Sequence, residues 1–344
     1  MMGTEAEEGR KTTGGSLKKG SGLLMMISVI GFVFFLTVVA WINWPKTRIA
    51  PEPLSAEQHS LINRIPGNSD AIIYLGMKEI RRSRFWQEVL PDSLKTIPLF
   101  QPPGKLNLLL KAASVNPATD IDALLMSFRR QGYRDQNFLA VANGPVAGKI
   151  SDRLLKRSGT AISLKGYACY RLDSTLWLSR SAPDEIILAG SQAMLEGFLA
   201  PSGSFFQRDS LAVAMMQKAV YKSHLWFALP SAAWTSSALE SLTSQNSDVN
   251  SLGNLNRIQH LALSVRFNEG IEAESEWVYG TRRAAWFAST FLWGALKLSG
   301  LSEERSTPEI RNLLERIRIQ QNLESVIIHT KLPLEIFTRQ KEER

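Results

Sequence analysis

The sequence predicts an α+β fold in which an N-terminal transmembrane helix precedes two similar strand–helix–hairpin–helix halves with antiparallel or mixed sheets. Two observations lead to this prediction. An uncharged apolar run covers residues 23–44, and after it short aliphatic runs alternate with stretches of helical period in an order that occurs twice. Periods of about 2 and 3.6 residues distinguish strands from helices, so this mixture indicates an α+β arrangement.

The composition is that of an ordinary globular protein. Of the 344 residues 44% are hydrophobic and 21% are charged, and the formal net charge is +8. The basic residues stand among acidic ones, so no nucleic-acid binding is expected and the charge indicates a slightly basic, solvated surface. Cys169 is the only cysteine, which excludes an intramolecular disulfide and a cysteine-based zinc site, and we expect it to be a small buried side chain.

The run over residues 23–44 is long enough for a membrane span. At 1.5 Å per residue it covers roughly 30 Å, about the thickness of a hydrocarbon core. Trp41 and Trp44 stand at one end, where aromatic rings favour the interface, and no cleavage site of a signal peptide follows. The bases before the run predict a single-pass inner-membrane protein with its N-terminus in the cytoplasm, so that residues 23–44 contact the lipid bilayer.

Composition divides the rest of the chain into four segments. Residues 1–22 are rich in Gly, Ser, Thr and charge and predict a disordered cytoplasmic stub. Residues 45–66 contain four prolines and predict a stalk that carries the extracytoplasmic region. Residues 67–205 and 206–344 are then the two α+β halves.

The first half is expected to alternate strands and helices. Its predicted elements, in order, are a strand at 70–75, a helix at 77–90, a helix at 106–114, a hairpin formed by strands at 120–129 and 136–142, a helix at 146–157, strands at 167–172, 175–179 and 185–190, and a helix at 191–199. Pro91 ends the first of these helices, and Ser191 caps the last.

The second half is expected to follow the same plan. His224–Leu229 with a helix over 231–243 resembles the strand and helix at 71–90, and Ile258–Arg266 matches Ile121–Arg129 in apolar character position by position. A helix over 281–298 follows the hairpin. A helix that begins at Thr307 with an N-cap and a proline, a strand over 325–329 and a short C-terminal helix complete the chain.

The helix predicted over 281–298 contains a second apolar segment. Residues 284–296 carry no charge and lie between Arg282-Arg283 and Lys297. Thirteen apolar residues or so are too few for a span, so the segment predicts a buried core helix. The alternative is a helix that lies in the surface of a bilayer.

Chemical signatures are few. The sequence has no phosphate-binding loop, no dinucleotide-binding glycine motif, no nucleophile elbow and no H-E-x-x-H motif. The four histidines are far apart in sequence, none at metal-ligand spacing, and an ordinary structural role is expected for each: His59, His224, His260 and His329. We therefore assign no catalytic, cofactor-binding or metal-binding residues and expect no cofactor.

Two acidic patterns nevertheless have a functional reading beside a structural one. Asp120 and Asp122 flank Ile121 at the start of a predicted strand and would point to the same side, where paired carboxylates share a proton or bind a metal. Glu272, Glu274 and Glu276 also occupy one face of a strand. The structural reading is a solvated strand entrance for the aspartates and a row paired with bases of the next strand for the glutamates.

Part of the chain resembles a known group of proteins. Ile65-Pro-Gly-Asn-Ser-Asp-Ala-Ile-Ile-Tyr-Leu75 with Ile80-Arg-Arg-Ser-Arg-Phe-Trp86 resembles the opening of uncharacterised bacterial single-pass membrane-anchored proteins with a duplicated α+β extracytoplasmic region. Ser83-Arg84 stands where Ser-Pro would be expected. The resemblance covers about residues 62–335; it implies a fold and a location, but no activity or catalytic residues.

The sequence leaves three functional hypotheses open. It favours a non-catalytic module in the cell envelope that binds or scaffolds a protein partner, without deciding whether the chain is an enzyme or what its oligomeric state is. One alternative is an envelope hydrolase that uses Asp120 and Asp122 or a histidine. The other is the binding of a lipid or another apolar ligand between the two halves.

Overall fold

The computed structural model describes residues 18–92, 95, 104–131, 135–235, 258–301 and 308–337, and it has two compact units, residues 1–45 and 46–344. The first unit contains helix α1 (Lys18–Asn43). A span requires about 20 consecutive apolar residues in one helix, and no helix in the described ranges is long and apolar enough to cross a membrane. The predicted transmembrane segment 23–44, and the single-pass inner-membrane location based on it, are therefore wrong. Residues 1–17 of the predicted stub lie outside the described ranges.

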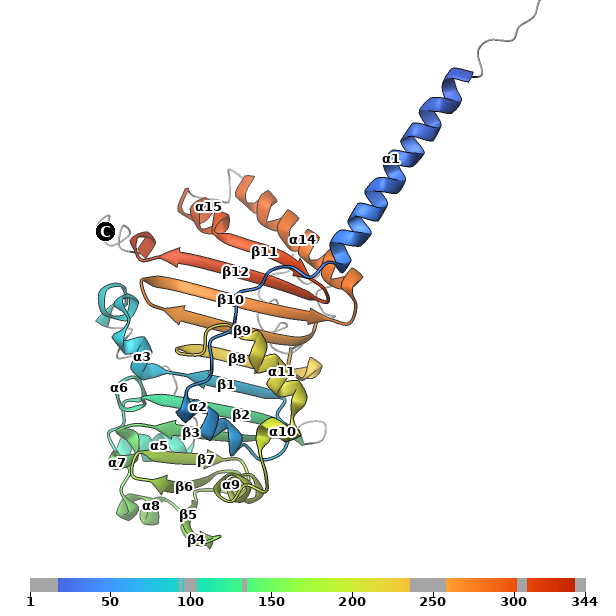
Figure 1. Ribbon diagram of the computed structural model, residues 1–344. Helices are drawn as coiled ribbons and strands as arrows, with labels where there is room; N and C mark the ends of the chain where they lie inside the picture. The colour runs from blue at the N-terminus through green and yellow to red at the C-terminus, as the bar shows by residue number, and fades with distance from the viewer. Residues whose placement is uncertain are drawn as a thin grey trace, which may run out of the picture. The chain divides into compact units, whose positions relative to one another are not determined.

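The second unit is built on one antiparallel sheet of 12 strands (Figure 1). The strands are β1 (Ala71–Leu75), β2 (Ala123–Gln131), β3 (Asp135–Asn143), β4 (Thr160–Leu164), β5 (Tyr167–Arg171), β6 (Trp177–Ala182), β7 (Glu185–Ala189), β8 (Leu225–Leu229), β9 (Ile258–Phe267), β10 (Gly270–Tyr279), β11 (Ile317–Asn322) and β12 (Ser325–Pro333). The strand order is β11-β12-β10-β9-β8-β1-β2-β3-β7-β6-β5-β4. The expectation of two halves with their own antiparallel or mixed sheets is thus wrong, because the strands in the described ranges join one antiparallel sheet.

The centre of this sheet is the pair formed by β1 and β8. Ile73 lies opposite Phe227 in that pair, and the strand order runs outwards from it as β1-β2-β3-β7-β6 on one side and β8-β9-β10-β12-β11 on the other. The registers agree as well. Ala71 lies opposite Phe128 in the first half, and Leu225 lies opposite Val265 in the second. Beyond β6, the hairpin of β5 and β4 extends the first side only.

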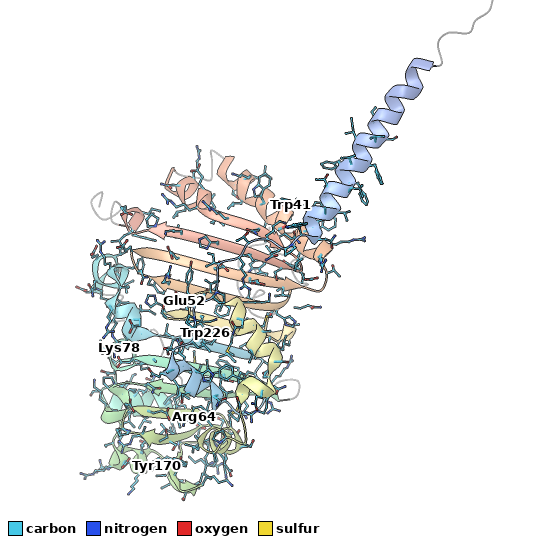
Figure 2. All side chains as sticks on the ribbon, viewed as in Figure 1. Trp41, Glu52, Arg64, Lys78, Tyr170 and Trp226 are labelled. Atoms are coloured by element: carbon cyan, nitrogen blue, oxygen red, sulfur yellow. The ribbon has the colours of Figure 1, made fainter. Side chains whose placement is uncertain are left out.

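One face of the sheet carries the main hydrophobic core. The helices on this face are α2 (Ala56–Asn63), α9 (Gln192–Leu199), α10 (Phe205–Arg208) and α11 (Ser210–Lys218). Trp226 at the centre of the sheet is fully buried, and its ring stacks on that of Tyr74 at 5.9 Å (Figure 2). Phe198 of α9 and Phe205 of α10 belong to the same hydrophobic cluster as Trp226. The two halves therefore meet in a packed strand pair, β1 and β8.

The opposite face is covered at its two ends. Short helices cover the end near β7 and β6: α5 (Lys105–Ala112), α7 (Val146–Lys149) and α8 (Asp152–Ser158). The long helix α14 (Arg282–Leu301) covers the end formed by β10, β12 and β11, and α15 (Pro308–Glu315) lies beside it. The predicted helix 231–243 begins as expected, but its residues from 236 onwards lie outside the described ranges.

Residues 46–54, which we call the strap, run across the strands in extended conformation and lead into α2 (Figure 1). They contact three strands: the backbone amide of Lys46 donates to the side chain of Asn322 on β11, Arg48 pairs with Glu276 on β10, and Glu52 pairs with Arg266 on β9. Helix α2 begins with a capping box formed by Ser55 and Gln58 and buries Leu61 and Ile62 in the main core. The predicted stalk over residues 45–66 is thus corrected from residue 46 onwards, because this segment packs on the sheet.

Two helices predicted as continuous are each interrupted at a serine whose hydroxyl forms hydrogen bonds with the backbone. The predicted helix 77–90 is divided into α3 (Met77–Arg82) and the π-helical turn η1 (Phe85–Val89). Between them Ser83 is extended, and its hydroxyl donates to the carbonyl of Ile80 and accepts from the amide of Trp86. The predicted helix 146–157 divides into α7 and α8 because Ser151 caps the second helix.

Candidate functional site

The two aspartates proposed as a catalytic pair are held by different cations. Asp120 ends the short helix α6 (Pro117–Asp120) instead of starting a strand. Its carboxylate accepts hydrogen bonds from the amide of Asn116 at 2.6 Å and from Lys149 at 2.7 Å. Burial alone would raise the pKa of Asp120, but these hydrogen bonds outweigh it and the net pKa is lowered. Asp122 pairs with Arg81 on α3. The two carboxylates are therefore tied to different helices, Asp120 to α7 and Asp122 to α3.

The glutamates of β10 form a buried ionic row beneath the strap. Glu272 pairs with Arg266 of β9 and with Lys331 of β12. Hydrogen bonds from Lys331 and Arg266 outweigh the burial that opposes ionisation, so the pKa of Glu272 is lowered. Glu276 pairs with Arg48 of the strap and with Lys218 of α11. Glu272 follows the structural reading, because its bases stand on the neighbouring strands, whereas Glu276 is buried rather than solvated and its bases come from the strap and α11.

Glu274 lies in the middle of this row and differs from its neighbours. It is 3% exposed, and its nearest cationic partner is His329, whose Nδ1 lies 3.7 Å from the carboxylate. That distance is too long for a hydrogen bond, and the second oxygen of Glu274 has no hydrogen-bond partner among the described atoms. No group of three His, Cys, Asp or Glu side chains in the described part of the chain could hold a metal ion.

The other histidines and the cysteine take part in ring stacking, hydrogen bonds to the backbone or burial in the core. His59 stacks on Phe206 at 4.3 Å. His224 is buried, which lowers its pKa, and its Nδ1 accepts the amide hydrogen of Phe267 at 2.7 Å. His260 bonds to the carbonyl oxygen of Pro230. Cys169 is buried, and burial raises the pKa of its thiol. The described histidines do not converge on Asp120 or Asp122.

Helix α14 presents a different kind of surface. Its inner side packs on the sheet through Ala285, Ala288 and Leu292, which contact the cluster around Tyr279 and Val326. Alanine at two of these positions brings the helix axis close to the strands. The residue spacing of 3, 4 and 7 is the pattern expected for the buried side of a helix, so the prediction of a core helix holds for this side.

The outer side of α14 is also apolar. Phe287 is 61% exposed, Phe291 45% and Leu298 70%. We call these three residues the outer stripe. They follow one another at spacings of 4 and 7 residues and therefore lie on one flank of the helix, about 110° around the axis from its buried side. Gly294 stands between them, and a Cβ there would meet nothing within 4 Å. Exposed single apolar residues are ordinary, but a row on one helix indicates a contact surface.

A groove adjoins the helix. It lies between α14, α15 and the start of β11 and has a volume of about 420 Å³. Its apolar lining consists of Trp293, Leu296, Leu314, Ile317 and Ile319. Trp293 is 53% exposed, so its indole is available from the solvent side.

The electrostatic character of this surface is basic. The lining of the groove includes three cationic side chains and one acid: Lys297, Arg311, Arg318 and Glu315. Helix α14 itself contains no aspartate or glutamate from Arg282 to Leu301. Opposite charges across an interface favour association and like charges oppose it. At about 100° per residue, Trp293, Leu296 and Lys297 point roughly 150° away from the outer stripe, so the groove and the stripe lie on opposite flanks of α14, with Arg283 and Lys297 between them.

Sequence reasoning found the helix but missed its exposed side. Residues 284–296 are so uniformly apolar that they predict a buried element, and both sides of the helix fit that pattern equally well. The available signal was the size of the side chains. The buried positions carry Ala285 and Ala288, whereas the exposed positions carry Phe287 and Phe291, and small residues pack against a sheet where large ones point away.

Comparisons with known proteins give little further information. No family model matches the chain, and no curated protein matches its sequence. The chain is similar to crystal structures of a protein named TP0453. Form I is 11% identical with a TM-score of 0.42, covering 87% of this chain and 99% of that one; form IV is 11% identical with a TM-score of 0.43, covering 85% and 96%. Similarity at this level carries no argument about function. The resemblance of residues 62–335 to membrane-anchored proteins stays a prediction.

Proposed function

We propose that this chain is a non-catalytic binding module, and that the outer stripe of α14 docks an acidic amphipathic helix of a partner protein. The observation that carries the proposal is the exposure of Phe287, Phe291 and Leu298 on one side of a helix whose other side is already packed. Their apolar area gains free energy when a partner removes it from water, at about 25 cal/mol per Å².

The geometry of the surface favours a helical occupant. Helix-in-groove recognition uses apolar anchors at spacings of 3, 4 and 7 residues, and the outer stripe offers a complementary row. The groove lined by Trp293, Leu296 and Leu314 lies on the other flank of α14 and takes no part in this contact.

The charges favour an acidic occupant. Arg283 and Lys297 stand between the outer stripe and the groove. A second copy of α14 would bring its own arginines and lysine against these groups, and like charges in contact oppose pairing. A partner helix with glutamates beside its apolar stripe neutralises them instead.

The contacts of the acidic side chains support the same proposal over the hydrolase alternative. Asp120 is engaged by Lys149 and Asp122 by Arg81, so neither is poised to activate a nucleophile. General acid–base catalysis requires a group near the reacting atoms whose proton can move at the working pH. A binding role makes no such demand.

The test is a titration of two synthetic helical peptides with the full-length chain, followed by fluorescence anisotropy. Both peptides carry the same leucine stripe; one has glutamate and the other lysine at every flanking position. We expect the acidic peptide to bind at least tenfold more tightly, with an affinity that falls as salt is added. Equal binding of both peptides, or of neither, contradicts the proposal. Uptake of a fluorescent fatty acid or adsorption to anionic vesicles without peptide binding would assign the surface to an apolar ligand.

A further inference from the structure

Strand β4 is one of the two edges of the sheet. It pairs with β5 on one side, with Ile162 opposite Cys169, and it ends the strand order on the other side. An edge strand presents backbone N–H and C=O groups that a further strand can pair with. Thr160, Ala161 and Ser163 are exposed, so the described chain leaves this edge accessible.

The composition of β4 lacks the usual protection of an edge. Its sequence, Thr-Ala-Ile-Ser-Leu, contains no proline and no charge, whereas natural edge strands commonly carry one or the other. The opposite edge, β11, differs in charge. It contains Arg318, and Lys46 donates a hydrogen bond to the carbonyl of Gln321 at 3.2 Å. A helix packs beside each edge strand, α15 beside β11 and α8 beside β4. Only one of the two edges is therefore left neutral.

The neutral strand is compatible with a copy of itself. If two β4 strands pair antiparallel about Ile162, Thr160 of one copy lies opposite Leu164 of the other, and Ala161 lies opposite Ser163. No charged side chains face each other within this ladder. The same chain already uses this kind of contact internally, because β1 and β8 join the two halves of the sheet as antiparallel neighbours.

We propose that two copies of this chain associate through antiparallel pairing of their β4 strands, with Ile162 on the two-fold axis. The contact is isologous, which is the commonest arrangement of protein dimers, and it continues the sheet from one copy into the next. The occupant of the edge is thus a second copy of the chain, and the proposal is independent of the role assigned to α14.

Two double variants test the pairing because they change the same exposed positions. In A161K/S163K each introduced lysine faces a lysine of the other copy, so we expect the dimer to be lost. In A161E/S163K each glutamate faces a lysine of the other copy, so we expect the dimer to be retained. The measurement is the molar mass of the full-length proteins by sedimentation velocity over a range of concentrations, with circular dichroism to verify that both variants fold.

The outcomes separate the possibilities. A wild-type dimer that persists in A161E/S163K and dissociates in A161K/S163K supports the proposal. A wild-type chain that stays monomeric contradicts it, as does loss of the dimer in both variants or in neither. A control variant, F287S/F291S, should leave the dimer intact, and its dissociation would assign self-association to the outer stripe instead.

Discussion

Arg48 of the strap and Glu276 of β10 form an ion pair of 2.7 Å, in which the glutamate side chain is almost fully buried. Lys218 of α11 approaches the same carboxylate. The contact attaches a segment near the start of the second unit to a strand more than two hundred residues further along the chain. It explains how an extended, proline-rich segment stays on the sheet.

Removing either partner of this pair should destabilise the protein. Loss of one charge leaves the other buried with fewer partners, which costs about 3–5 kcal/mol in buried pairs; the partial exposure of Arg48 and the presence of Lys218 reduce this, so we expect about 1–3 kcal/mol for R48M. Urea unfolding of R48M, E276Q and the double variant measures the coupling. The control is R82M, which breaks the exposed pair between Arg82 and Glu79 and should cost at most about 0.5 kcal/mol. Equal effects of R48M and R82M would contradict the role of the strap.

Two buried serines at corresponding positions of β2 and β9 should differ in importance. The hydroxyl of Ser264 accepts the amide hydrogens of Val220 and Tyr221 at 3.0 and 3.1 Å, whereas within the described ranges the hydroxyl of Ser127 forms a hydrogen bond with the hydroxyl of Ser69. S264A leaves two buried amides without an acceptor, so we expect a loss of about 2–3 kcal/mol, against about 1 kcal/mol for S127A. Chemical denaturation of both variants measures the difference, and a larger effect of S127A would refute the expectation.

The stability of the fold should rise with pH above 7 because of Lys222. Burial lowers the pKa of Lys222 from its usual 10.5 to about 7. Between pH 7 and 10 the unfolded chain therefore binds a proton that the folded chain does not, and the free energy of unfolding increases by up to about 1.4 kcal/mol per pH unit. Tyr221 acts in the opposite direction only above pH 10, since burial raises its pKa to about 12.

Denaturation of wild type and K222M at pH 7, 8 and 9 measures this dependence. The wild-type free energy of unfolding should increase over the series, and that of K222M should increase less. The ammonium or amine of Lys222 also donates to the carbonyls of Met216 and Ala219 at the end of α11, so K222M has a constant penalty that does not depend on pH. Identical slopes for the two proteins would show that Lys222 does not titrate in this range.

Binding of the acidic peptide should depend on the outer stripe rather than on exposed apolar residues in general. Leu298 of α14 and Leu108 of α5 are 70% and 68% exposed, so L298S and L108S remove equal amounts of exposed apolar surface. We expect L298S to weaken binding about tenfold, corresponding to the loss of about 1.4 kcal/mol, and L108S to have no effect. Anisotropy titrations measure both, and equal losses would contradict the assigned surface.

Local features of the fold could be predicted from the sequence, whereas contacts between distant segments could not. The aliphatic run at 71–75 predicts β1, and Ser191 predicts the start of α9; both are confirmed. The pairing of β1 with β8 joins segments about 150 residues apart, and no local pattern specifies it. The same holds for the strap, where prolines predict an extended chain but not the arginine that attaches it to Glu276.

The error at Asp120 had a readable signal. Asn116 followed by Pro117 is an N-cap with a proline at the first helical position, which predicts a helical turn over the next residues. The aliphatic run that follows predicts a strand just as strongly, so the predicted strand begins at residue 120 instead of after the turn. Because the turn intervenes, Asp120 faces Lys149 and Asp122 faces Arg81, and the two carboxylates do not form the predicted pair.

The central claim is that the outer stripe of α14 docks an acidic amphipathic helix. Its most direct test is photo-crosslinking of the full-length chain with the acidic peptide carrying a benzophenone beside its leucine stripe, followed by peptide mapping. The account predicts crosslinks within α14 at and beside the outer stripe, which the lysine-flanked peptide does not give. Crosslinks spread over the surface, or concentrated on another element, would contradict it.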